Sequence, residues 1–185
     1  GSEMCIRDRY YMYFGGIWGG QLQRWRNGVF NPNNPTSPTA FLPNDDEPAL
    51  LPFVAKMSDD LLEFAEKPRE VQILDEKGKL LLAGDNERRF FEAAWVHKYN
   101  GKYYFSYSTG DTHFICYAVG DNPYGPFTYK GKILNPVVGW TSHHSICEFK
   151  GKWYLFYHDS SLSKGVTHLR SIKIAEIQYD EDGLI

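Results

Sequence analysis

Glu92 stands in the stretch FFEAAW, directly before the strand-like run VHKYNGKYYFSYS. A carboxylate in apolar surroundings is costly unless it has a partner or a use. Crowding by Phe90, Phe91 and Trp95 would disfavour the charged form and keep a proton on the carboxyl near neutral pH. A general acid behaves in this way. The alternative is a carboxylate at the rim, paired with one of the two arginines that precede it.

Aromatic rings near Glu92 could also bind a carbohydrate. Rings such as that of Phe91 supply flat apolar faces on which sugars pack, and an acid beside them could protonate a glycosidic oxygen. Trp18, between the glycine pairs of GGIWGG, is a second candidate platform, because glycine allows close approach to the backbone. A bent strand with Trp18 in the core explains the GGIWGG sequence nearly as well.

His143, His144 and Arg170 are the other candidate site residues. Two adjacent histidines suggest metal binding, but neighbouring strand residues point to opposite faces, so the pair cannot chelate one ion. A buried histidine that donates to a backbone carbonyl is the commoner role. Arg170 lies between apolar Leu169 and Ile172 on an alternating strand, where it needs an anionic partner or a ligand hydroxyl. A surface salt bridge is the alternative.

A repeat positions these residues. Three aromatic stretches resemble one another: YYMYFGG (residues 10–16), KYYFSYS (102–108) and KWYLFYH (152–158). Tyr104 aligns with Tyr154, 50 positions later, and this period is typical of propeller blades. One period contains four expected strands, AAWVHKY, KYYFSYS, HFICYAV and PFTYKGKIL, separated by turn sequences. The register places Glu92 and the histidine pair on a shared central face.

The predicted fold is therefore all-β, a partial propeller of about two complete blades and part of a third. Closed propellers usually have four to eight blades. Residues 1–9 do not continue the pattern and are expected to be an unrelated leader, which leaves residues 10–185 as the C-terminal part of the domain. Asn27–Leu50 is rich in proline and asparagine and is expected to be an insertion loop. Met57–Pro68 could form a short helical turn capped by Ser58.

Net charge, apolar runs and cysteine spacing disfavour several kinds of partner and site. The net charge is -3 and the basic residues are scattered, which disfavours nucleic acid and anionic membranes as partners. No apolar run approaches the roughly 18 residues of a membrane-spanning helix. Cys5, Cys116 and Cys147 show no metal-binding spacing and predict no disulfide framework. Cys116 and Cys147 lie in strand-like segments, and their thiols are expected to be buried in the core.

The sequence resembles the C-terminal blades of family 43 glycoside hydrolases, five-bladed β-propeller enzymes related to β-xylosidases, α-L-arabinofuranosidases and arabinanases. The resemblance extends from about Tyr10 to the end, with EA, NGKYY, HHS and LRS in that order. It implies an inverting mechanism with three carboxylates: an Asp base, an Asp that tunes the acid, and a Glu acid. No cofactor is required, although a structural calcium ion in the central tunnel belongs to this picture.

The resemblance assigns a role to individual residues. Glu92 matches the acid, and His143 matches a histidine that meets water or calcium in the tunnel. Arg170 matches an arginine of the sugar subsite, Trp18 an aromatic wall, and Thr112 a polar subsite contact.

The base Asp is expected on a first blade that this chain lacks, and the tuning Asp just upstream of Tyr10, where the sequence reads GSEMCIRDR. Asp8 lies near that place, but its surroundings do not match. The resemblance thus implies a parent enzyme that cleaves xylosyl or arabinofuranosyl linkages of plant cell-wall polysaccharide, and an inactive isolated chain. A glycan-binding propeller without catalysis and a protein-interaction propeller of the kelch kind are the alternatives.

Overall fold

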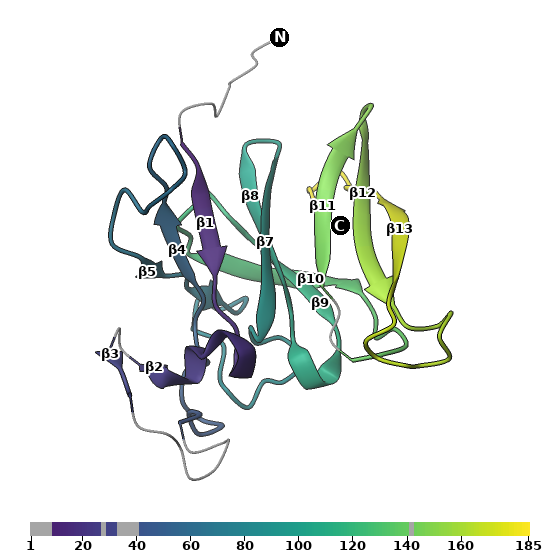
Figure 1. Cartoon of the computed structure of the whole chain (residues 1–185). Helices are drawn as coiled ribbons and strands as arrows, with labels where there is room; N and C mark the ends of the chain where they lie inside the picture. The colour runs from purple at the N-terminus through teal and green to yellow at the C-terminus, as the bar shows by residue number, and fades with distance from the viewer. Residues whose placement is uncertain (1–8, 27–28, 33–40, 141–142) are drawn as a thin grey trace.

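The computed structural model describes residues 9–26, 29–32, 41–140 and 143–185, and these residues form an all-β structure (Figure 1). Three sheets carry the fold, and a two-stranded ribbon of β2 (Trp25–Arg26) and β3 (Val29–Phe30) accompanies them. Short 3-10 turns occur at η1 (Trp18–Gly20), η2 (Leu22–Arg24) and η3 (Gly110–Thr112). Among the described residues, no helix is long and apolar enough to cross a membrane.

The first sheet has the strand order β1-β4-β5. Its strands are β1 (Tyr11–Phe14), β4 (Phe53–Lys56) and β5 (Arg69–Glu70). β1 and β4 are antiparallel, with Tyr11 opposite Lys56 and Phe14 opposite Phe53. The long connection between them contains the predicted insertion loop, whose residues 27–28 and 33–40 lie outside the described part of the chain.

The central sheet has the order β6-β10-β9-β8-β7. Its strands are β6 (Ile73–Leu74), β7 (Glu92–Tyr99), β8 (Lys102–Ser108), β9 (Ile115–Gly120) and β10 (Phe127–Leu134). The last four are the four strands predicted for one period, and all are confirmed. β6 joins as a fifth strand, parallel to β10. It is too short for a sequence pattern to predict.

The third sheet has the order β11-β12-β13. Its strands are β11 (His144–Phe149), β12 (Lys152–Asp159) and β13 (Ser171–Ile177). The turn sequences NG and KG close the β7–β8 and β11–β12 hairpins, with positive φ at Asn100, Gly101, Lys150 and Gly151. Tight hairpins require such left-handed residues, because only these turns match the twist of the strands.

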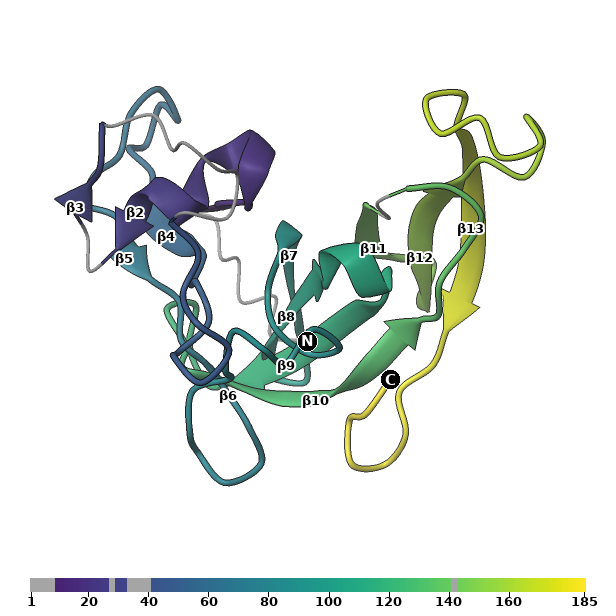
Figure 2. The same ribbon diagram turned by 90° about the horizontal axis from the view of Figure 1, so that it is seen from below.

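The sheets follow one another around a curve that is open on one side (Figure 2). β7 contacts β1 on one side and β11 on the other. A continuous apolar core lies between the first and central sheets and includes Val54, Phe90, Phe105 and Phe127. This arrangement places the beginning of β7, where Glu92 lies, between the two neighbouring sheets.

Two local predictions are wrong. Met57–Pro68 is not helical; an isolated bridge joins Met57 to Phe64, and the Ser58 hydroxyl donates to Asp60 across the turn. The Ser58 side chain thus stabilises a turn of the backbone, as short polar side chains often do. Cys116 is buried as expected, but Cys147 is exposed, because its face of β11 is not covered by another sheet. Cys5 and the rest of the predicted leader except Arg9 lie outside the described residues.

Candidate active site

A bulge at the start of β7 sets the position of Glu92. Glu92 pairs with Ser108, and Trp95 pairs with Ser106. Between these two pairs β7 therefore contains one residue more than β8. Ala93, inside the bulge, has a φ of 62°. Bulges of this kind bend a strand and re-aim the side chains beside it.

The carboxylate of Glu92 lies beside His143, with 3.3 Å between Oε1 and the imidazole Nε2. The Glu92 side chain is 21% exposed and that of His143 is 51% exposed. Gly16 packs against the other side, where an added Cβ would lie 3.4 Å from the Cβ of Glu92. The Glu92 carboxylate is therefore partly enclosed between the first and third sheets, as the register predicts.

The three aromatic residues predicted to crowd Glu92 have other roles. Phe90 and Phe91 belong to the core and are 1% and 5% exposed. The Trp95 indole instead reaches the third sheet and donates to the carbonyl of Ile146. Phe91 therefore acts through packing, and its buried ring does not offer the open sugar platform expected from the sequence.

His158 was not among the predicted site residues, yet it connects two of them. Its Nε2 accepts a hydrogen bond from the backbone N–H of His143 at 3.2 Å and lies 3.4 Å from Nη1 of Arg170. The two imidazole rings are stacked, with their centroids 6.3 Å apart. Burial and the charge of Arg170 lower the pKa of His158, which favours the neutral ring that these bonds require. In the 50-residue repeat His158 aligns with Ser108, the partner of Glu92, which is the signal that could have identified it.

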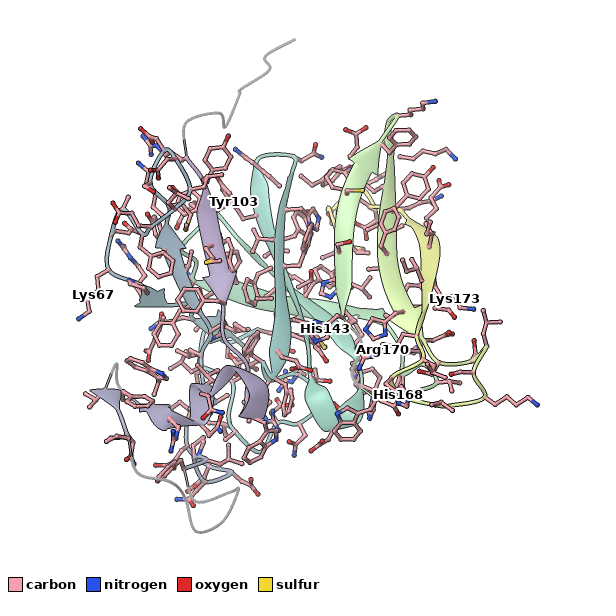
Figure 3. All side chains as sticks on the ribbon, viewed as in Figure 1. Lys67, Tyr103, His143, His168, Arg170 and Lys173 are labelled. Atoms are coloured by element: carbon pink, nitrogen blue, oxygen red, sulfur yellow. The ribbon has the colours of Figure 1, made fainter. Side chains whose placement is uncertain are left out.

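Arg170 lies one residue before β13 and not on the strand, in contrast to the prediction. Leu169 and Ile172 beside it are exposed, because this edge strand faces outward. The guanidinium donates to the carbonyl of Thr167 and contacts His158, so its partners are neutral and it carries its charge into the site. Figure 3 shows Arg170 beside His143 at one end of the third sheet.

Trp18 lies in η1 with a φ of 64° and is 37% exposed. Its backbone N–H donates to the side chain of Gln23, which is buried. The preceding Ile17 N–H donates to the carbonyl of Phe91, so the GGIWGG segment is fastened to the chain just before Glu92. Trp18 is therefore a half-exposed ring on the segment that flanks Glu92, and not a core residue.

Thr112 has a structural explanation. Its hydroxyl donates to the carbonyl of Asn86 and lies 2.6 Å from the hydroxyl of Thr109. These bonds fasten η3 to the loop before Glu92. These bonds already engage the Thr112 hydroxyl. Its contact with a sugar remains a prediction.

The adjacent His144 points away from His143, as strand alternation predicts. Its Nε2 lies 2.6 Å from the Ser106 hydroxyl, and its Nδ1 is buried without a partner among the described residues. Burial, together with His143 and His97, lowers the pKa of His144 to about 3. His144 is thus a neutral histidine between the central and third sheets.

A second buried histidine, His97, also favours its neutral form. Its ring packs against Tyr104 and Trp153, and Nε2 lies 2.6 Å from the Tyr179 hydroxyl. Burial lowers the pKa of His97 from its ordinary 6.5 to about 4. Between these values the unfolded chain binds a proton that the folded chain does not, so acidification favours unfolding.

We expect the free energy of unfolding to fall as the pH decreases from about 6.5 to about 4, by up to about 1.4 kcal/mol per pH unit from this residue. Urea unfolding at several pH values in this range measures the slope. His97→Gln, which cannot titrate, should give a flatter dependence than the unchanged chain. Equal slopes would show that His97 does not carry the effect.

The residues around His143 do not by themselves fit a calcium site. Calcium takes six to eight oxygen ligands, whereas within the described part of the chain Glu92 supplies the one carboxylate in contact with His143. The described ranges hold no group of three or more His, Cys, Asp or Glu side chains that could bind a metal.

Comparison with known proteins decides the family. The model of glycosyl hydrolases family 43 matches residues 53–185, which include Glu92, His143 and Arg170. The chain belongs to glycosyl hydrolase family 43. Its three sheets are accordingly part of a β-propeller, as the sequence predicts.

Curated family 43 relatives cover nearly the whole chain. A xylosidase/arabinosidase of Bacteroides ovatus is 66% identical over 95% of the chain, and a beta-xylosidase of Xylanibacter ruminicola is 61% identical over 95%. These matches cover 52% and 53% of the two relatives. The chain thus spans about half the length of the curated relatives it matches.

Solved structures of the family superpose closely. RS223-Beta-xylosidase is 66% identical with a TM-score of 0.90, over 97% of this chain and 54% of that one. CoXyl43, a GH43 beta-xylosidase/alpha-arabinofuranosidase from a compost microbial metagenome, is 65% identical with a TM-score of 0.90, over 96% and 53%; that structure is a complex with xylotriose in a calcium-free form.

Proposed function

We propose that the protein containing this chain hydrolyses xylosyl or arabinofuranosyl linkages of plant cell-wall polysaccharide, with Glu92 as the general acid. The observation that carries the proposal is the partly enclosed Glu92 carboxyl, 3.3 Å from His143. The names of the similar enzymes support the substrate class. The proposal concerns the whole protein, because this chain spans about half the length of its relatives.

In the proposed reaction, Glu92 gives its proton to the glycosidic oxygen as the bond to the anomeric carbon breaks. The departing sugar leaves as an alcohol, and a water attacks the opposite face of the ring with inversion. A second carboxylate must take a proton from this water, at about 6.5–9.5 Å from the acid. We assign that base to sequence outside residues 10–185.

The neighbours of Glu92 would position the substrate. His143 contacts the carboxyl and can hold its orientation, while His158 holds the backbone of His143 and approaches Arg170. Arg170 presents a charged donor that suits sugar hydroxyls. Trp18 offers a half-exposed ring beside the acid for the apolar face of a sugar.

The test compares this chain alone with the same chain joined to the first half of a relative. We expect no turnover of p-nitrophenyl xyloside or p-nitrophenyl arabinofuranoside by the purified chain, because an inverting enzyme needs both carboxylates. A chimera that joins the first half of the Bacteroides ovatus relative to residues 10–185 should hydrolyse at least one of them. Release of p-nitrophenol measures both.

Two outcomes would contradict the proposal. A folded chimera, judged by circular dichroism and chromatography, that hydrolyses neither substrate would remove the hydrolase function. Turnover by the chain alone, lost in Glu92→Gln, would show that the base lies within this chain.

A further inference from the structure

Three polar residues lie together at one end of the third sheet. β11 and β13 begin at His144 and Ser171, so His143 and Arg170 each lie one residue outside a strand. His158 lies inside β12, one residue before that strand ends. Because β12 is antiparallel to both neighbours, its end lies beside their beginnings (Figure 1).

The backbone of His158 is held on both sides. β12 is the central strand of the sheet, where His158 pairs across to β13 and the preceding Tyr157 pairs across to β11. Residues at the ends of strands open more easily than residues within a paired strand. The imidazole of His158 therefore starts from a better-fixed backbone than the side chains of His143 and Arg170.

A single nitrogen of His158 faces both neighbours. Its Nε2 accepts the backbone N–H of His143 at 3.2 Å, and Nη1 of Arg170 lies 3.4 Å from the same atom. Both neighbouring groups are donors, so Nε2 must carry the lone pair and Nδ1 the proton of the neutral ring. A protonated ring would offer no acceptor and would place a second positive charge against the guanidinium.

The two neighbours carry the groups that face the reaction. Nε2 of His143 lies 3.3 Å from Oε1 of Glu92. The guanidinium of Arg170 is fixed on its other side by the hydrogen bond from Nε to the carbonyl of Thr167. Among the described residues, no hydrogen bond joins His158 to Glu92 itself. Any effect of His158 on the acid must therefore pass through the residues that it holds.

We propose that His158 is a positioning residue, whose neutral imidazole fixes His143 and Arg170 relative to each other by accepting from both at one nitrogen. This inference rests on the proposed function, which assigns the acid to Glu92 and a sugar contact to Arg170. The positions of these groups matter, because a displacement of about 1 Å can cost about 10²-fold in rate.

The first measurement uses the ¹⁵N-labelled chain alone and needs no catalysis. At neutral pH we expect the ¹⁵N chemical shifts of His158 to show a protonated Nδ1 and an unprotonated Nε2, with a scalar coupling across the hydrogen bond to the His143 amide. In His158→Leu the His143 amide should shift, and the Nε proton of Arg170 should exchange faster with water. His158→Gln should keep both signals near those of the parent, because its side-chain oxygen can accept in place of Nε2.

The second measurement is hydrolysis of xylobiose by the chimera with the Bacteroides ovatus relative. His158→Leu should lower kcat/KM about 10–100-fold, which corresponds to one hydrogen bond to a charged group. His158→Gln should stay within about threefold of the parent, since one neutral acceptor replaces another. In an Arg170→Met background, the loss from His158→Leu should be at least about threefold smaller, because residues that act together are not additive.

His168→Leu is the matched control, since His168 is an exposed histidine on the loop that carries Arg170; it should leave the rate near that of the parent. A protonated Nε2 in His158, or a His143 amide that does not change in His158→Leu, would overturn the proposal on the chain alone. Equal losses in the Gln and Leu variants would show that His158 acts by its shape and not as an acceptor, which also overturns it. Fully additive effects with Arg170→Met would do the same. An inactive parent chimera would count against the proposed hydrolase, and the spectra of the chain would still decide the role of His158.

Discussion

Glu92→Gln in the chimeric full-length protein is expected to lower kcat/KM for xylobiose about 10²–10⁴-fold, the usual contribution of a general acid. Glutamine preserves the shape of the side chain and can still contact His143, but it has no proton to give. The departing sugar is a poor leaving group and needs that proton as the bond breaks. Steady-state hydrolysis measured by product chromatography gives the ratio.

The leaving group separates acid catalysis from structural damage. p-Nitrophenolate departs readily without protonation, so Glu92→Gln should impair p-nitrophenyl xyloside far less than xylobiose. Glu87→Gln is the matched control, because Glu87 is an exposed carboxylate paired with Lys132 at 2.8 Å; it should leave both rates near those of the parent. An equal loss on both substrates in Glu92→Gln would argue against the acid role.

Gly110→Ala is expected to destabilise the chain by about 2–5 kcal/mol. Gly110 covers the buried ring of Phe91, and an added Cβ would lie 2.4 Å from ring atoms. Its φ is +79°, a conformation that costs an alanine about 1–2 kcal/mol. Displacement of a packed ring adds about 1–3 kcal/mol. Urea unfolding followed by tryptophan fluorescence measures the change.

Gly101→Ala separates the cost of the backbone conformation from the cost of displacing the Phe91 ring. Gly101 has nearly the same φ, +80°, but an added Cβ there meets nothing within 4 Å. It should lose only the conformational part, about 1–2 kcal/mol. If the two variants are destabilised equally, the Phe91 ring moves freely and does not support the position of Glu92.

The sequence alone determined the four consecutive strands β7 to β10 and the β11–β12 hairpin. The aromatic stretches and the NG and KG turns predict the hairpins around Gly101 and Gly151, because side-chain alternation and left-handed turn residues are local properties. The 50-residue repeat brings Glu92 and His143 to the same level of neighbouring sheets, and the structure places them 3.3 Å apart.

The tertiary structure decided what depends on packing between distant segments. The sequence makes Phe91 a candidate sugar platform, yet Gly110 and the core enclose its ring. His158 becomes part of the site because β12 lies between β11 and the Arg170 loop, where its imidazole can meet both. Such contacts are set by how sheets pack and loops return, which no local pattern encodes.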